Sequence, residues 1–132
     1  MNWLTAHRMV ITRGLAWFGI LAIVILSVVP ADVRPTTGAA PGFEHLAAFG
    51  LVAGVFAFGY RLSLGRLLLL AFLYCGGIEL LQVPVPTRHA RLSDFVIDVG
   101  SAWAAMCLVA VSGKLSVAYR LRRQRQKPQP DT

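Results

Sequence analysis

The sequence predicts an all-α fold, an integral membrane bundle of four transmembrane helices, and three observations support that prediction. Hydrophobic residues make up 56% of the chain and charged residues only 14%, whereas about a quarter of the residues in soluble domains are charged. The mean hydropathy is +0.62, and four apolar stretches approach the roughly 20 residues that a helix needs to cross a bilayer. Most Lys and Arg residues lie outside those stretches. This composition excludes a soluble enzyme and an intrinsically disordered chain.

The predicted helices span residues 10–29, 43–60, 64–83 and 94–113. Backbone groups inside a bilayer must satisfy one another, and these stretches lack the alternation of apolar and polar residues that is typical of barrel strands. Helix-breaking residues mark the joints: Pro30, Pro35 and Pro41, then Gly65, then Pro84 and Pro86.

The chain shows no internal repeat and no separate soluble domain. We assign residues 1–113 to one membrane domain and residues 114–132 to a basic cytoplasmic tail that is partly disordered. The tail is expected to anchor the topology, with contact to anionic lipid headgroups as the functional alternative. It lacks the aromatic or groove-reading residues of nucleic-acid-binding segments, so no nucleic-acid partner is expected. Cys75 and Cys107 both lie in apolar stretches, which argues against a disulfide-linked secreted fold.

The distribution of Lys and Arg predicts that both termini are cytoplasmic. Ten of the 13 basic residues fall in segments that this orientation places inside, and Arg34, Arg88 and Arg91 fall outside. Segments rich in Lys and Arg stay on the cytoplasmic side of a membrane. The first helix could instead be a secretory signal cleaved near Pro30, but its length and that proline favour a retained helix. The expected location is the bacterial inner membrane, as a multi-pass protein.

Polar residues of three predicted helices fall at one depth, near the outer helix ends. At 1.5 Å per residue, His45, Glu79 and Asp98 each lie roughly 5–7 Å below those ends. Gln82 shares a helix face with Glu79, and Asp94 shares one with Asp98. Charged residues inside a bilayer are costly and are by default paired or functional. We therefore predict a functional site, with His45, Glu79, Asp94 and Asp98 as candidate catalytic residues and Gln82, Arg88 and Arg91 as ligand-binding residues.

A purely structural explanation competes with this site. Glu79 and Asp98 could pair with His45 or with the loop arginines and fix the register of the helices, and Asp94 could serve only as a helix cap. Glu44 is predicted to point about 100° away from its neighbour and to lie at the interface. A divalent metal is a further alternative, but the acids and His45 lack the spacing of a compact metal site. No metal and no cofactor is predicted.

Three short motifs lie at the outer ends of these helices. They are Phe43-Glu44-His45 with its continuation to Gly50, the pair Glu79 and Gln82, and the run from Arg88 through Asp94 to Asp98. The motifs resemble those of the VanZ-like family of small bacterial membrane proteins, which has a His-aromatic motif, Glu-x-x-Gln and Arg-x5-Asp-x3-Asn/Asp in the corresponding places.

The chain departs from the VanZ-like pattern at two places. Pro41 and Gly42 stand where the family often has Asp-Lys, and Asp98 stands where Asn is common. The resemblance implies a cell-envelope membrane protein related to low-level glycopeptide resistance, and it implies no defined biochemical activity.

The sequence favours a protein that binds or modifies an anionic amphiphile at the outer leaflet. Arg88 and Arg91 would hold a phosphate or carboxylate group, and Glu79, Asp98 and His45 would supply acid–base groups. The expected partners are membrane lipids, including a lipid-linked envelope intermediate. The alternative is a non-catalytic scaffold whose polar residues fix helix packing. Whether the protein is an enzyme stays open, because no nucleophile has a base at recognisable spacing.

The predicted topology is testable with reporter fusions. A reporter that is active only in the cytoplasm should be active when fused after Thr132, because four spans return the chain to its starting side. A fusion at that position that is active only in the periplasm would contradict the predicted orientation.

Overall fold

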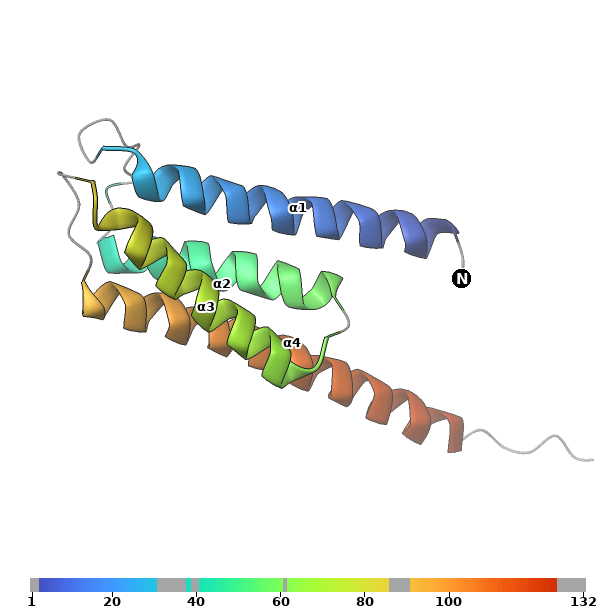
Figure 1. The fold of residues 1–132 in the computed structure, drawn as a ribbon. Coiled ribbons are helices and arrows are strands. Elements are labelled where there is room, and N and C mark those ends of the chain that lie inside the picture. The colour runs from blue at the N-terminus through green and yellow to red at the C-terminus, as the bar shows by residue number, and fades with distance from the viewer. Residues whose placement is uncertain (1–2, 31–37, 39–40, 61, 86–90, 126–132) are drawn as a thin grey trace, which may run out of the picture.

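The computed structural model describes residues 3–30, 38, 41–60, 62–85 and 91–125. All regular structure in this part of the chain is helical: α1 (Trp3–Val28), α2 (Pro41–Gly59), α3 (Leu64–Gln82) and α4 (Leu92–Arg125) (Figure 1). Each of these helices is long and apolar enough to cross a membrane. The predicted all-α class with four spans is confirmed, and the protein is a multi-pass membrane protein.

The two central helices of the bundle are α2 and α4, which share the most extensive interface. α1 packs mainly on α2, α3 packs mainly on α4, and α1 meets α3 over a shorter stretch. The first residues of α1 and the last residues of α4 lie at the same end of the bundle (Figure 1). This arrangement places the α2 to α3 connection at that end and the beginning of α2 and α4 at the other.

Small residues explain the close approach of α2 and α4. A Cβ atom on Gly50 would lie 3.6 Å from the backbone oxygen of Ser101, and one on Gly54 would lie 3.7 Å from the Cβ of Ala105. The two glycines are four residues apart and therefore share a helix face. Small residues at this spacing let helix backbones pack closely inside membranes, where van der Waals contact drives association.

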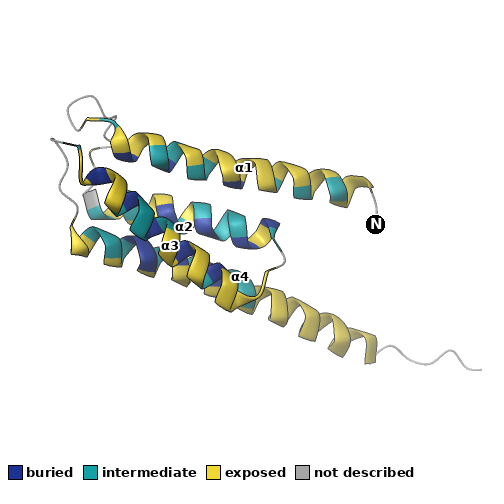
Figure 2. Cartoon of the chain, viewed as in Figure 1, coloured by how far each residue is buried: buried dark blue, intermediate teal, exposed yellow. Residues whose placement is uncertain are grey.

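Buried residues line the inside of the bundle, and the outward faces are apolar and exposed (Figure 2). One core cluster is built around Ala53, Leu67, Ala71, Ala102 and Met106. A second cluster contains Ile23, Phe49, Cys75, Ile78 and Val99. Exposed apolar side chains are compatible with this fold because the solvent around a membrane span is itself hydrocarbon.

A polar and aromatic contact fixes α1 to the last turn of α2. Arg13 donates from Nε to the backbone oxygen of Gly59 at 3.0 Å, and its guanidinium lies 4.9 Å from the centre of the Tyr60 ring. Trp17 donates from Nε1 to the hydroxyl of Tyr60 at 2.8 Å. The last carbonyl groups of a helix have no intrahelical donor, so Arg13 satisfies one of them with a cation at the negative helix end.

Two helices are longer than the sequence analysis predicts. α1 begins at Trp3, not at residue 10, and α4 continues through Gly113 to Arg125. The segment after Gly113 is rich in residues with high helix propensity, and one glycine costs only about 1 kcal/mol. With 34 residues, α4 is about 51 Å long against a hydrocarbon core of about 30 Å.

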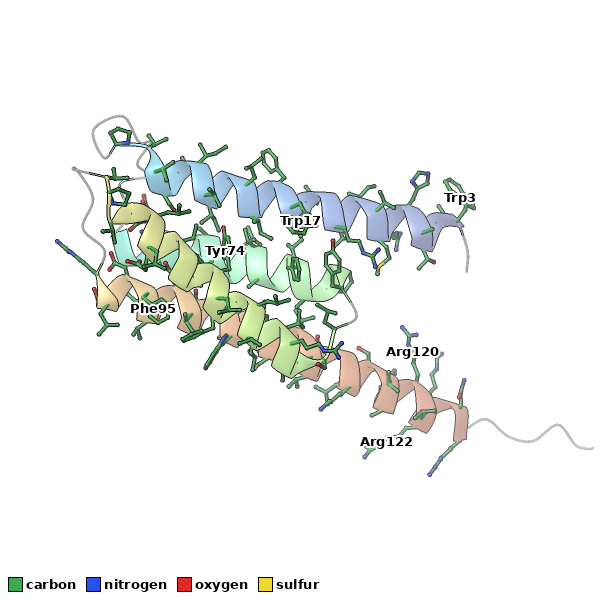
Figure 3. The ribbon with its side chains drawn as sticks, in the orientation of Figure 1. Trp3, Trp17, Tyr74, Phe95, Arg120 and Arg122 are labelled. Atoms are coloured by element: carbon green, nitrogen blue, oxygen red, sulfur yellow. The ribbon has the colours of Figure 1, made fainter. Side chains whose placement is uncertain are left out.

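The end of α4 therefore projects beyond α2 and α3 (Figure 1). Arg120 and Arg122 extend from opposite sides of this projection (Figure 3). Part of the segment predicted as a partly disordered tail is thus helical, and residues 126–132 lie outside the described residues.

Two glycines of α1 provide a matched test of its packing. A Cβ on Gly19 would lie 2.6 Å from Cγ2 of Val52, whereas a Cβ on Gly14 would have no atom within 4 Å. Val52 is β-branched and cannot rotate away cheaply. Gly19→Ala should lower the free energy of unfolding by about 1–3 kcal/mol, as overpacking does, and Gly14→Ala should not. Thermal unfolding of both variants in the same detergent measures the difference, and equal stabilities would contradict the packing of α1 on α2.

Candidate functional site

A buried pair joins α2 to α4 near the beginning of both helices. Nδ1 of His45 lies 3.0 Å from Oδ1 of Asp98, and Asp98 is fully buried. The ionised form of Asp98 only accepts hydrogen bonds, so it pairs with a His45 ring that carries a hydrogen on Nδ1. Phe49, one turn further along α2, stacks on the imidazole with ring centres 6.1 Å apart.

The packing of α2 on α4 positions this pair. Gly50 lies against the backbone of Ser101, and this contact brings the two helices close enough for short side chains to meet. Ser101 donates from Oγ to the backbone oxygen of Asp98 at 3.0 Å. His45 and Asp98 therefore meet because small residues lie one turn further into the bilayer on both helices.

Three buried carboxyl oxygens at this site have no hydrogen-bond partner among the described residues. They are Oδ2 of Asp98 and both side-chain oxygens of Glu79 on α3. Glu79 lies within electrostatic range of Asp98, Asp94 and His45. The backbone N–H of Arg91 also interacts with the Glu79 carboxyl as a weak donor, outside hydrogen-bonding geometry. A buried polar group without a partner costs about 1–3 kcal/mol, and more when it is charged, so these oxygens require an explanation.

A small cavity lies beside the pair and opens among three helices. Its volume is about 60 Å³, and its polar lining residues are Ser27 of α1, Glu44 and His45 of α2, and Gln82 of α3. Gln82 is buried, with 5% of its surface exposed. A cavity of this size holds a few water molecules or one small polar group.

The structure brings most of the predicted site residues together. His45, Glu79 and Asp98 converge from three helices. Asp94 lies within electrostatic range of both other acids; it is partly exposed and accepts a hydrogen bond from the hydroxyl of Ser93 at 3.1 Å.

The two predicted arginines are placed differently. Arg91 is exposed directly before α4, and its backbone oxygen accepts from the N–H groups of Asp94 and Phe95 at 3.0 and 3.2 Å. Arg88 lies outside the described residues, so its role as a ligand-binding residue stays a prediction.

Sequence reasoning missed three contributors to this end of the bundle. Glu44 lines the same cavity as His45, a contact that the sequence does not predict. Ser27 lines the cavity from α1, and Tyr74 of α3 donates from its hydroxyl to the backbone oxygen of Ile20 at 2.8 Å. Tyr74 lies five residues before Glu79, which is about 140° around the helix, so its spacing gives no signal of a shared face.

The described residues contain no group of three or more His, Cys, Asp or Glu side chains arranged to hold a metal ion. Comparison with known proteins also gives no assignment: no family model, curated protein or solved structure matches the chain. The resemblance to the VanZ-like family stays a prediction from the sequence motifs.

Substitutions at Asp98 test whether the pair holds α2 and α4 together. Asp98→Ala removes the hydrogen bond between Asp98 and Nδ1 of half-buried His45, so the free energy of unfolding should fall by about 1–3 kcal/mol. Asp98→Asn keeps the acceptor and the volume and should remain near wild-type stability. Ser101→Ala is the matched control, because it removes a hydrogen bond that stays within α4.

Thermal unfolding of the three variants in one detergent gives the comparison. Equal stability of Asp98→Ala and Ser101→Ala would show that the pair does not link the helices.

Proposed function

We propose that the chain is a bacterial inner-membrane protein of the VanZ-like type that binds the headgroup of an amphiphile at the outer leaflet. One observation carries this proposal: Oδ2 of Asp98 and both oxygens of Glu79 are buried without a hydrogen-bond partner in the described part of the chain. Carboxylates inside a bilayer are expensive. A ligand that donates hydrogen bonds to them removes part of that cost.

The chemistry of these oxygens indicates the ligand group. Carboxylates accept hydrogen bonds and attract cations, so the matching ligand atoms are hydroxyl or ammonium groups. Gln82 and Ser27 in the adjoining cavity are neutral groups able to donate and to accept. Glu79 and Asp98 alone do not fit a purely anionic ligand, because carboxylates repel anions.

An anionic part of the ligand requires basic residues nearby. Arg91 is exposed at the beginning of α4, at the same end of the bundle as the acids. A guanidinium binds phosphate oxygens in a bidentate manner, and the predicted role of Arg88 is the same. We therefore propose a lipid headgroup that combines a phosphate with hydroxyl or ammonium donors.

The His45–Asp98 pair supports modification of the ligand as an extension of binding. A carboxylate that accepts from one imidazole nitrogen fixes the tautomer and orientation of the ring, and an oriented imidazole is the commonest general base. Binding is the function that the present geometry supports best.

A scaffold is the second candidate, and one observation favours it. The pair joins α2 and α4, the two helices with the most extensive interface. We call His45, Glu79, Asp94 and Asp98 the polar cluster. If the polar cluster serves only to fix this interface, then removing a carboxylate should change stability and leave lipid binding unchanged.

Native mass spectrometry of the purified protein with defined lipids separates these functions. Phosphatidylethanolamine and phosphatidylcholine with identical acyl chains both carry a phosphate, but only the former has ammonium hydrogens to donate. The wild type should prefer phosphatidylethanolamine by about tenfold, because one hydrogen bond to a charged group is worth about 1.5 kcal/mol. Glu79→Gln should reduce this preference while unfolding at the wild-type temperature.

Arg122→Gln is the matched control, since it neutralises one charge on the projecting end of α4, remote from the acids. This variant should weaken the binding of both lipids equally and keep the preference for phosphatidylethanolamine. Equal binding of both lipids by the wild type would contradict the proposed function, and so would a Glu79→Gln variant that loses stability but keeps the preference.

A further inference from the structure

We infer that the apolar cavity between α1 and α3 holds a hydrocarbon chain of the lipid whose headgroup the polar cluster binds. This inference rests on the proposed function and extends it, because it makes the ligand an intact bilayer lipid rather than a soluble headgroup compound.

The cavity reaches from the interior of the bundle to its lipid-facing surface. Its volume is about 200 Å³, and all four helices line it. Cys75 and Ala102 form its interior with 0% and 2% exposure, whereas Trp17 of α1 and Leu70 of α3 line its rim with 57% and 46% exposure. A cavity of about 150 Å³ with apolar walls binds a benzene molecule. This cavity therefore has room for a segment of a hydrocarbon chain.

The opening lies between the two packed helices that share the least contact. α1 and α3 contact each other over a shorter stretch than the other packed pairs. Tyr74 lies between the two helices (Figure 3), where its hydroxyl donates to the backbone oxygen of Ile20. Ala53 on α2 and Ala71 on α3 line the cavity with side chains too short to fill it.

The cavity adjoins the polar site. Ile23 and Phe49 line both the apolar cavity and the small polar cavity, and Phe49 stacks on His45. From Phe49 the apolar cavity follows α2 to Phe56, a distance of about 10 Å along the helix. A molecule with a polar head and an apolar chain fits both cavities at once, and the bilayer at the rim consists of such molecules.

Photolabelling of the full-length protein in lipid nanodiscs tests this inference. The probe is a phosphatidylethanolamine with a diazirine in the middle of one acyl chain, and irradiation followed by peptide mass spectrometry locates the adducts. We expect adducts at Ala53 and Cys75, which lie in the cavity and are at most 7% exposed. Exposed Leu51 and Cys107 report on the surrounding lipid. Labelling of Leu51 and Cys107 without labelling of Ala53 and Cys75 would overturn the inference.

A pair of variants on α2 tests whether the probe reaches Cys75 through the cavity. Ala53→Phe places a ring in the cavity and should remove most of the Cys75 adduct while leaving the Cys107 adduct unchanged. Leu51→Phe adds the same ring on the lipid-facing side and should change neither. A Cys75 adduct of wild-type size in folded Ala53→Phe would count against the cavity as the binding place. If Ala53→Phe does not fold, the inference is tested by the wild-type protein alone, through labelling of Ala53 and Cys75 compared with Leu51 and Cys107.

The same experiment with a phosphatidylcholine probe separates this inference from the proposed function. Equal labelling of Cys75 by both probes supports the cavity as a chain site and contradicts headgroup selection by the acids. A preference for phosphatidylethanolamine in native mass spectrometry, together with unlabelled Cys75, supports the headgroup site and overturns the chain site alone.

Discussion

The burial of a carboxylate inside a membrane span is the constraint on which the rest of this structure depends. Asp98 is fully buried, and its contact with His45 requires α2 and α4 to approach closely. That approach requires small residues at their interface, and Gly50 against Ser101 supplies them. The most extensive helix interface of the bundle and the polar cluster are thus two consequences of one arrangement.

The number, type and approximate position of the helices could be predicted from the sequence, because the bilayer imposes length and hydrophobicity on each span. α1 and α4 extend beyond the predicted spans, since a residue beyond the hydrocarbon core can remain helical without being apolar. The location of His45, Glu79 and Asp98 at one end of the bundle could be predicted from helix geometry alone. Their pairing did not follow, because Gly50 and Gly54 set it, and a glycine in an apolar run gives no sign of which helix it will contact.

The roles of Glu44, Ser27 and Tyr74 could not be predicted from the sequence for a related reason. Each depends on which helices become neighbours, and that information lies in the packing of α1 against α2 and α3. The bundle joins two environments: a polar cavity near the beginning of α2 and an apolar cavity along the same helix. An amphiphile has the same division of character, which is why we propose a lipid as the ligand and not a soluble compound.

The distance between the buried acids and a lipid headgroup is the most direct measure of whether the polar cluster is a ligand site. Solid-state NMR of the protein, with ¹³C in the side-chain carboxyl carbons of Asp and Glu and ¹⁵N in the ammonium group of phosphatidylethanolamine, reports that distance through dipolar dephasing. A hydrogen bond between the groups places the two nuclei within about 4 Å. We predict dephasing of the Glu79 or Asp98 signal that disappears in Glu79→Gln or Asp98→Asn. Undiminished signals from both carboxyls in the folded wild-type protein would contradict it and leave the cluster as a contact between helices.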